Sequence, residues 1–401
     1  MNVLIEFFDE EPIENLITCT HFHMDKVICF GYKPIMTLEG RGKLKRSHKV
    51  LCGDHDMEFV EVPYGDLNEI VEIMDGVLAR EYGAGNQCFF DLTGGGDLVL
   101  VAMGILSAKY PTPMHQFNVT TGKLNVIAQK DVKSISELAE HHEKQLTLDQ
   151  VIRFYGGRID YNAQKDYKSH LDDKSFKTDV MNMWKVASSD QRKWNGFSAF
   201  LRSCMNFQLT DLIVDVSAED MKRMLKKTPG IRSLKEINQY LTMLGNCGVL
   251  QDVKVGQDGA YFAYKDYMTK DVIHDAGCIL ELHTYYNFKD SGRYSDVRVG
   301  AHIAWDDDTW YDDDNVKNEI DVLALEGCVP VFVSCKNGKV DQMALYELDT
   351  VARRFGGKRA KNIMMTGQKI ADGYAKRAVE MNIEVQCMEK QGRSNHESIT
   401  D

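Results

Sequence analysis

The sequence predicts an α/β protein built in three parts, and three observations support this fold class. Strand-like apolar runs alternate with amphipathic helices up to about residue 128. The segment from about 135 to 268 has mainly helical periodicity, and strands alternate with helices again towards residue 388. With 401 residues the chain exceeds the usual size of one hydrophobic core, so we expect separate domains.

The N-terminal part predicts a parallel, doubly wound sheet, because its strands alternate with helices. The acidic turn after the first strand leads into a helix, and a buried strand ends directly before a run of three glycines. The expected strands are 3–8, 26–31, 88–92 and 118–128, and the expected helices are 66–79 and 98–109.

The middle part shows apolar helical stripes at 181–187 and 195–207. Ser233 can cap a helix over residues 233–244, and two short strand-like runs flank residues 256–259. A helix followed by a two-stranded wing predicts a winged-helix module, which serves for spacing or dimerisation as well as for DNA binding.

The C-terminal part predicts a helix-led α/β/α sandwich. Its acidic loop, 306–315, lacks the glycine and the final glutamate of a calcium-binding EF-hand, so we interpret it as a solvated hairpin tip. The expected helices are 271–283, 342–355 and 371–381, and the expected strands are 296–305, 318–325, 329–335, 362–366 and 383–388.

Composition and charge exclude some classes of protein. A net charge of -12 argues against a protein that coats nucleic acid with its whole surface, but it leaves room for a local basic groove. A run of bases between Arg353 and Arg377 is either such a groove or a solvated helix face. No apolar stretch is long enough to cross a membrane, and the N-terminus does not resemble a signal peptide, so we expect a cytoplasmic protein without a membrane partner.

The cysteines and histidines give no metal motif. The 10 cysteines contain no C-x-x-C pair, so reduced, partly buried thiols are expected. His21 with His23, or His141 with His142, could bind a metal ion, but neither pair has partner ligands at motif spacing.

A catalytic constellation is predicted in the C-terminal part. Asp321 interrupts the start of an apolar strand, and a buried carboxylate requires a strong partner such as a metal ion. Lys336 ends the following strand, and Glu281 lies on the preceding helix. Carboxylates, a metal ion and an ammonium group are what phosphodiester cleavage needs, because the ion activates water and the lysine stabilises negative charge. The alternative is a structural ion pair between Asp321 and Lys336.

These residues give the segment from about 270 to 390 a resemblance to the PD-(D/E)XK, or restriction-endonuclease-like, nucleases. In that family a helix glutamate, a strand aspartate and a strand (D/E)-x-K follow one another, as Glu281, Asp321 and Ser334–Lys336 do here. Ser334 departs from the pattern, since the family usually has a carboxylate there. The resemblance implies a Mn²⁺ or Mg²⁺ ion held by Glu281, Asp321 and the carbonyl group of Cys335, with Ser334 and Lys336 in the catalytic site.

A glycine-rich turn in the N-terminal part, Thr93–Asp97, joins a strand to a helix. Free backbone N–H groups at such a helix N-terminus favour phosphate, although a tight turn that only packs the helix is the alternative. The turn is not the G-x-G-x-x-G fingerprint of dinucleotide-binding proteins and follows a late strand, so a dehydrogenase is not expected.

The N-terminal part resembles the CRISPR-associated Rossmann-fold (CARF) sensor domains, which bind cyclic oligoadenylates across the two-fold axis of a homodimer. Thr93–Gly95 matches the family's hallmark turn, and Glu11–Asn15 matches its other ligand loop. Where the family commonly continues with Thr-Lys, this chain has Gly96 and Asp97. The implied ligand-binding residues are Glu10, Glu11, Pro12, Asn15, Thr93, Gly94, Gly95, Gly96 and Asp97.

Together the two resemblances cover nearly the whole chain and are similar to the cyclic-oligoadenylate-activated nucleases of type III CRISPR defence. They imply a homodimer, activation by cyclic tetraadenylate, DNA nicking, and single-stranded DNA or RNA as further substrates. The expected domains are a Rossmann-like CARF sensor at 1–134, a helical and winged-helix-like connecting region at 135–268, a nuclease domain at 269–392 and a polar tail at 393–401.

Two other functions remain open at this point. A sensor joined to a winged helix could be a ligand-responsive transcription regulator whose C-terminal domain is only structural. A ring nuclease that degrades its own ligand is the second alternative, although no obvious catalytic base adjoins Thr93–Asp97 in the sequence.

Overall fold

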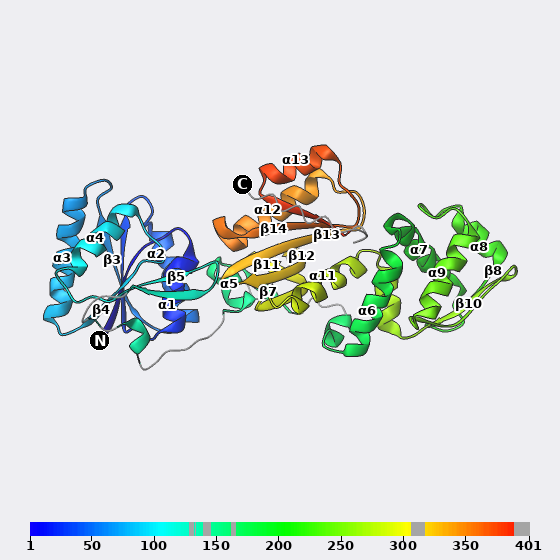
Figure 1. The fold of residues 1–401 in the computed structure, drawn as a ribbon, viewed down its shortest axis with the longest axis horizontal. Coiled ribbons are helices and arrows are strands. Elements are labelled where there is room, and N and C mark those ends of the chain that lie inside the picture. Colours follow the sequence, from blue (N-terminus) through cyan, green and yellow to red (C-terminus); the bar gives the residue numbers. More distant parts are fainter. Residues whose placement is uncertain (128–131, 133, 139–145, 162–165, 306–316, 389–401) are drawn as a thin grey trace.

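A computed structural model describes the chain except for residues 128–131, 133, 139–145, 162–165, 306–316 and 389–401. Three predicted segments therefore lie outside the described residues: the acidic loop 306–315, the histidine pair 141–142 and the polar tail 393–401. Three units lie in a row in Figure 1, and their order in space differs from their order in the chain. The C-terminal unit, called the nuclease unit after the predicted site it carries, lies between the N-terminal unit, called the sensor unit after its predicted ligand turn, and a largely helical middle unit.

The sensor unit is the predicted doubly wound sheet, with strand order β3-β2-β1-β4-β5-β6. All neighbouring strands are parallel except β5 and β6, which form an antiparallel hairpin where a single strand was expected. The strands are β1 (Asn2–Phe7), β2 (Lys26–Tyr32), β3 (Asp56–Val62), β4 (Gln87–Asp91), β5 (Met114–Asn118) and β6 (Lys123–Ile127), and the helices are α1 (Pro12–His21), α2 (Leu38–Leu51), α3 (Leu67–Gly83) and α4 (Asp97–Ser107).

The topology of this sheet positions the predicted ligand loops. β1 and β4 are adjacent parallel strands, with Ile5 paired to Phe90. The loops that follow them therefore leave the same edge of the sheet, at the point where the strand order changes direction. Ligands of doubly wound folds bind at such a switch point.

The nuclease unit is built on a mixed sheet with the order β15-β14-β13-β12-β11-β7. Its strands are β7 (Arg158–Asp160), β11 (Asp296–Ala304), β12 (Lys317–Glu326), β13 (Val329–Lys336), β14 (Lys361–Thr366) and β15 (Ile383–Cys387). Its helices are α5 (Leu148–Phe154), α11 (Cys278–Asp290), α12 (Gln342–Gly356) and α13 (Asp372–Glu380), with the short helical turn η4 (Gly357–Arg359) after α12. The edge strand β7 pairs with β11, although its residues fall inside the segment expected to connect the two domains.

The middle unit contains α6 (Lys174–Ala187), α7 (Gln191–Ser203), α8 (Ala218–Leu225), α9 (Leu234–Asn246) and α10 (Tyr267–His274). Ser233 caps α9 as predicted, since its side chain accepts a hydrogen bond from the N–H of Glu236. The expected two-stranded wing is a three-stranded sheet, β8-β10-β9, because β8 (Ile213–Ser217) adds to β9 (Leu250–Val255) and β10 (Gly259–Tyr264). The single helix expected over 271–283 is also wrong: α10 ends at His274, and α11 begins after Gly277.

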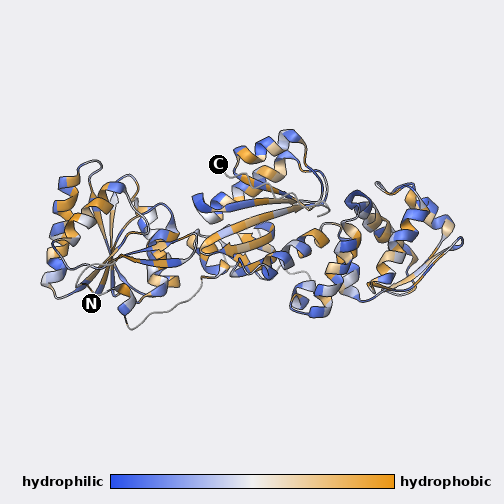
Figure 2. Ribbon diagram, viewed as in Figure 1, coloured by the Kyte–Doolittle hydropathy of each residue, from blue (hydrophilic) through white to orange (hydrophobic). Residues whose placement is uncertain are grey.

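The nuclease sheet joins the other two units through its two faces. Phe332 and Leu323 belong to a buried cluster that extends through α5 into the sensor unit. Val331 and Val333 belong to a second cluster, which extends through α11 into the middle unit. Figure 2 shows hydrophobic strands in the nuclease sheet and helices that carry both hydrophobic and hydrophilic residues. None of the described helices is long and apolar enough to cross a membrane.

Candidate functional sites: a carboxylate edge and a sensor turn

Asp321 and the end of β13 form a compact polar site in the nuclease unit. The antiparallel register that pairs Val322 with Val333 places Asp321 beside Ser334. The Ser334 hydroxyl donates to Asp321 Oδ2 over 3.3 Å, and the backbone N–H of Cys335 donates to the same oxygen over 2.6 Å. The pairing of β12 with β13 thus brings Asp321 to the end of β13.

The surroundings of Asp321 disfavour its charged form when no cation is bound. Burial is the largest influence and raises the pKa of Asp321, and the charge of Glu319 adds to it. The Cys335 N–H, the Lys336 ammonium and the Ser334 hydroxyl act in the opposite direction without cancelling the rise. A bound divalent ion would stabilise the charged carboxylate in the same place.

Glu281 reaches this site from α11. Burial raises the pKa of the Cys335 thiol well above its ordinary value, and the charges of Asp321 and Glu281 raise it further. Both carboxylates therefore lie near the same side chain, and the Cys335 sulfur is 3.9 Å from the Thr284 hydroxyl of α11. Oxygen donors of this kind suit Mg²⁺ or Mn²⁺.

Sequence reasoning missed Glu319 as a member of this edge. It lies two residues before Asp321 on β12, so both point to the same side of the strand. Its carboxylate is exposed and lies 3.9 Å from His302 Nε2 on β11. The alternation of side chains along a strand could have identified Glu319 as a carboxylate near the predicted metal site, where the usual carboxylate is replaced by Ser334.

The predicted basic groove is divided by the fold. The end of α12 packs beside Pro330, at the start of β13, and so at the far end of that strand from Lys336. Lys358 and Arg359 point from there into the sensor unit. Lys358 and Arg359 are therefore neither part of a local basic groove nor of a solvated helix face, the two alternatives left open for this run.

In the sensor unit the two predicted ligand loops meet at Gly94. A Cβ atom on Gly94 would lie 2.7 Å from Glu14 Oε2 and 3.1 Å from Asp9 Oδ2, so a larger residue would collide with these carboxylates. A Cβ atom on Gly96 would lie 2.5 Å from the Tyr32 hydroxyl. The glycines are thus required by close approach, and no side chain caps the N-terminus of α4.

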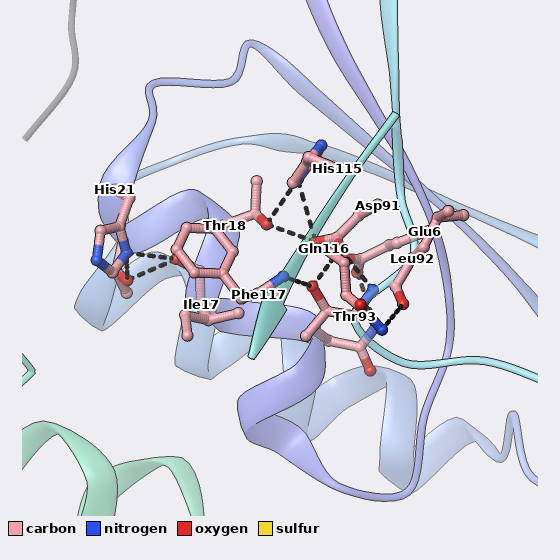
Figure 3. A network of polar contacts seen from close by, with 12 residues as sticks. Glu6, Ile17, Thr18, His21, Asp91, Leu92, Thr93, His115, Gln116 and Phe117 are labelled. Carbon is pink, nitrogen blue, oxygen red and sulfur yellow. Dashed lines mark hydrogen bonds and ion pairs between the residues drawn. The ribbon is translucent and has the colours of Figure 1, made fainter. Parts of the chain in front are cut away.

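Thr93 is held by a buried network beneath this turn (Figure 3). Its N–H donates to Asp91 over 2.8 Å, and its hydroxyl accepts a hydrogen bond from the N–H of Phe117 over 2.9 Å. Thr18 donates to the same Asp91 carboxylate, and His115 lies beside it. Burial raises the pKa of Asp91, but the charge of His115 and these hydrogen bonds outweigh it and leave that pKa lowered. Thr93 therefore anchors the glycine-rich turn to the buried residues Asp91 and Phe117.

The β1–α1 loop points partly away from the glycine turn. The carboxylate of Glu11 accepts hydrogen bonds from the Lys358 N–H over 2.9 Å and from the Tyr155 hydroxyl over 3.0 Å. Glu10 forms an ion pair with the Lys358 ammonium over 2.9 Å. The Asn15 amide holds the loop internally by accepting from the N–H of Asp9 over 2.8 Å. Three side chains predicted to bind ligand are therefore occupied by contacts within the protein.

Glu14 connects the turn to the nuclease unit. It adjoins Gly94 on one side, and on the other it accepts a hydrogen bond from Arg359 Nε over 3.0 Å. Burial and the charge of Asp9 raise the pKa of Glu14 to about 7, against the lowering effect of Arg359. One side chain thus separates the predicted phosphate-binding turn from η4.

Gly357 shows how closely the two units fit. Its φ of 63° lies in the left-handed region, and a Cβ atom there would overlap the Glu11 carboxylate. A cavity of about 970 Å³ lies beside this contact, between the β1–α1 loop, α2 and the end of α12.

The chain is similar to one protein family over its C-terminal part and to several solved structures over nearly its whole length. Residues 270–396 match the family model described as "Card1-like, endonuclease domain". Protein VC1899 from Vibrio cholerae has a similar structure, with a TM-score of 0.65 and 12% identity over 96% of this chain and 94% of that one. Can2 from Sulfobacillus thermosulfidooxidans, solved in complex with cyclic tetra-adenylate, has a TM-score of 0.59 and 15% identity over 96% and 93%. No curated protein matches the chain.

Residues 270–396 thus match an endonuclease domain family, and the fold of nearly the whole chain is similar to the folds of VC1899 and Can2. The predicted fold class is thereby confirmed, and the C-terminal domain is an enzyme domain as expected.

The buried Glu6 beside Asp91 predicts a pH-dependent stability. Burial and the charge of Asp91 raise the pKa of Glu6 well above its ordinary value. An acid whose pKa rises on folding stabilises the protein below its unfolded pKa, and this contribution is lost as the pH rises through the folded pKa. In thermal unfolding from about pH 6 to 9, we expect the Tm of the wild type to fall relative to that of Glu6→Gln.

Glu61→Gln is the matched control, because Glu61 is an exposed glutamate on β3 of the same sheet. Its difference from the wild type should stay constant over the same range. A Glu6→Gln difference that is equally constant would contradict a raised pKa of Glu6.

Proposed function

We propose that the protein is a metal-dependent endonuclease that cyclic tetraadenylate activates through the sensor unit, as a cytoplasmic homodimer. DNA is the proposed substrate, cut by nicking, with single-stranded DNA or RNA as further substrates. The observation that carries the proposal is the position of Glu14, which adjoins the glycine turn and binds Arg359 of the nuclease unit. The cyclic tetra-adenylate in the similarly folded Can2 structure supports the choice of ligand.

In the nuclease unit, Glu281 and Asp321 would hold the ion, together with the Cys335 carbonyl group. The ion supplies Lewis acidity at the phosphate and acidifies a bound water. Lys336 ends β13 beside Asp321, where its ammonium group can orient the attacking water and neutralise charge that develops on the phosphate. Ser334 keeps Asp321 in place through its hydroxyl.

In the sensor unit, the backbone of Thr93–Asp97 would receive the phosphates of the ring at the N-terminus of α4. Two aromatic side chains that were not predicted from the sequence lie on this side of the sensor unit. The buried Tyr32 lies against Gly96, and its ring centroid is 5.0 Å from that of Tyr64, which is 85% exposed. The exposed Tyr64 ring can stack on an adenine base.

The homodimer would form around the sensor sheet. Val101 and Ile105 lie four residues apart on α4, and each is 48% exposed. They form an apolar stripe on the helix that follows the glycine turn. Burying this stripe against a second copy would bring two turns to one ligand, as a symmetric ring requires.

A ring nuclease is the second candidate function, because the structure supplies the base that was not evident in the sequence. Glu14 adjoins Gly94, and burial raises its pKa to about 7, near the pH at which a general base works best. The transcription-regulator alternative is not favoured, since the C-terminal domain matches an endonuclease family.

The test is cleavage of supercoiled plasmid and labelled single strands with Mn²⁺ or Mg²⁺, with and without cyclic tetraadenylate. We expect that nicking of the plasmid requires both the ion and the ligand. No ligand-dependent cleavage with any cyclic oligoadenylate would overturn it. Chromatography of the recovered ligand in the same samples separates ring cleavage from simple binding.

Lys336→Ala should abolish cleavage while leaving ligand binding intact. Removing the ammonium from the Asp321 edge should lower the cleavage rate by about 100-fold or more. The rate would be followed on nicked plasmid, and ligand affinity by calorimetry. Lys339→Ala is the control, since this lysine follows in the loop beyond β13, and it should cleave normally. Equal activity of Lys336→Ala and the wild type would remove Lys336 from the mechanism.

Arg359→Ala should uncouple the two units. Without the Arg359 guanidinium, Glu14 loses its link to the nuclease unit, and the ratio of cleavage with ligand to cleavage without it should fall about fivefold or more. Arg377→Ala is the control, because Arg377 pairs with Glu380 on the exposed side of α13. An unchanged activation ratio in Arg359→Ala, with normal ligand affinity, would show that the signal does not pass through Glu14.

A further inference from the structure

Cys19, His48 and His55 form a cluster of metal-ligating side chains that lies outside both sites described above. One donor atom of each residue lies within 4.8 Å of the others. Cys19 belongs to the last turn of α1, His48 to the last turn of α2, and His55 to the turn directly before β3. Residues far apart in the sequence thus converge at one corner of the sensor unit, which explains why motif spacing did not reveal them.

Hydrogen bonds orient both imidazole rings and determine which ring nitrogen carries the proton. His48 Nε2 lies 3.1 Å from the carbonyl oxygen of Asn15, and His55 Nδ1 lies 2.6 Å from that of Met24. Since a carbonyl oxygen only accepts, each of these nitrogens carries the proton. The lone pairs are therefore on His48 Nδ1 and His55 Nε2. Metal-binding histidines commonly show this arrangement, in which the second ring nitrogen donates to a carbonyl group.

The two lone-pair nitrogens are buried, and neither has a hydrogen-bond partner among the described residues. His48 is 1% exposed and Cys19 is 6% exposed, whereas His55 is half-buried beside an exposed turn through which an ion could enter. A buried acceptor without a partner is destabilising, so two of them in one cluster need an explanation. A cation that accepts both lone pairs and the thiolate provides one.

We propose that Cys19, His48 and His55 bind a zinc ion. Two imidazoles and a thiolate are ligands that zinc prefers, whereas the carboxylates of the nuclease edge suit Mg²⁺ or Mn²⁺. Water can complete the coordination, since the Cys52 thiol donates to the carbonyl oxygen of Leu16 over 3.9 Å and is not part of the cluster. The chain would therefore hold two kinds of metal in two units.

Such an ion would tie together three segments of the sensor unit. It would join the end of α1 to the end of α2 and to the turn before β3. The other end of α1 carries Glu11 and Glu14, and His48 itself donates to the backbone of Asn15. The zinc site would thus fix the helix on which the contact with the nuclease unit depends.

The test is a Co²⁺ titration of the full-length, chelator-treated protein in the Asp321→Asn background, in which the nuclease edge has lost a ligand. A cobalt ion bound to Cys19 produces an intense near-ultraviolet charge-transfer band, which oxygen and nitrogen ligands do not give. We expect the band to saturate at one equivalent per chain and to disappear on addition of one equivalent of zinc.

Cys19→Ala should remove the band, and Cys88→Ala should keep it, because Cys88 is an equally buried cysteine of the same unit on β4. His55→Gln, at a half-buried position, should weaken zinc binding about tenfold or more and serves if Cys19→Ala does not fold. A protein without the band, or a band of equal strength in Cys19→Ala, would overturn the proposal, as would unchanged zinc affinity in His55→Gln.

Discussion

The Glu11 carboxylate lies between the sensor unit and the nuclease unit and accepts hydrogen bonds from the Lys358 N–H and the Tyr155 hydroxyl. Glu11 is buried, so removing these donors would leave a charged group without partners, at a cost of at least about 1–3 kcal/mol. Gly357 is compatible with this contact because it has no side chain and a positive φ. The loop after β1 is therefore fixed by the nuclease unit as firmly as by its own sheet.

The nuclease unit is in contact with both of the other units, and the Glu11 contact is part of its interface with the sensor unit. The nuclease sheet shares one buried cluster with the sensor and the other with the middle unit, so its position depends on both neighbours. At the catalytic end, the Asn337 side chain donates to Asn195 Oδ1 of α7 over 2.9 Å, directly after Lys336. At the opposite end, η4 meets the sensor loop. A change in the sensor can thus reach the ends of β13 and β14 through rigid elements.

Local sequence signals predicted most of the fold and the nuclease edge. Alternating apolar residues and the Ser233 cap identified strands and helices, and the order Glu281, Asp321, Lys336 predicted a site that could be proposed from sequence because β12 and β13 follow one another in the chain. The sequence could not predict that β7 completes the nuclease sheet, or that Lys358 and Arg359 face the sensor, since both depend on packing between distant segments. Glu14 and the Cys19 cluster were missed for the same reason.

We infer that ligand binding in the sensor unit acts on the nuclease unit through the contact between the β1–α1 loop and η4. Amide hydrogen exchange with and without cyclic tetraadenylate is the most direct test, because the Lys358 N–H is bonded to Glu11. We expect the ligand to change the exchange rate of this amide about fivefold or more, while the exposed helix α13 is unaffected. Protection of the turn Thr93–Asp97 alone, with Lys358 unchanged, would contradict it.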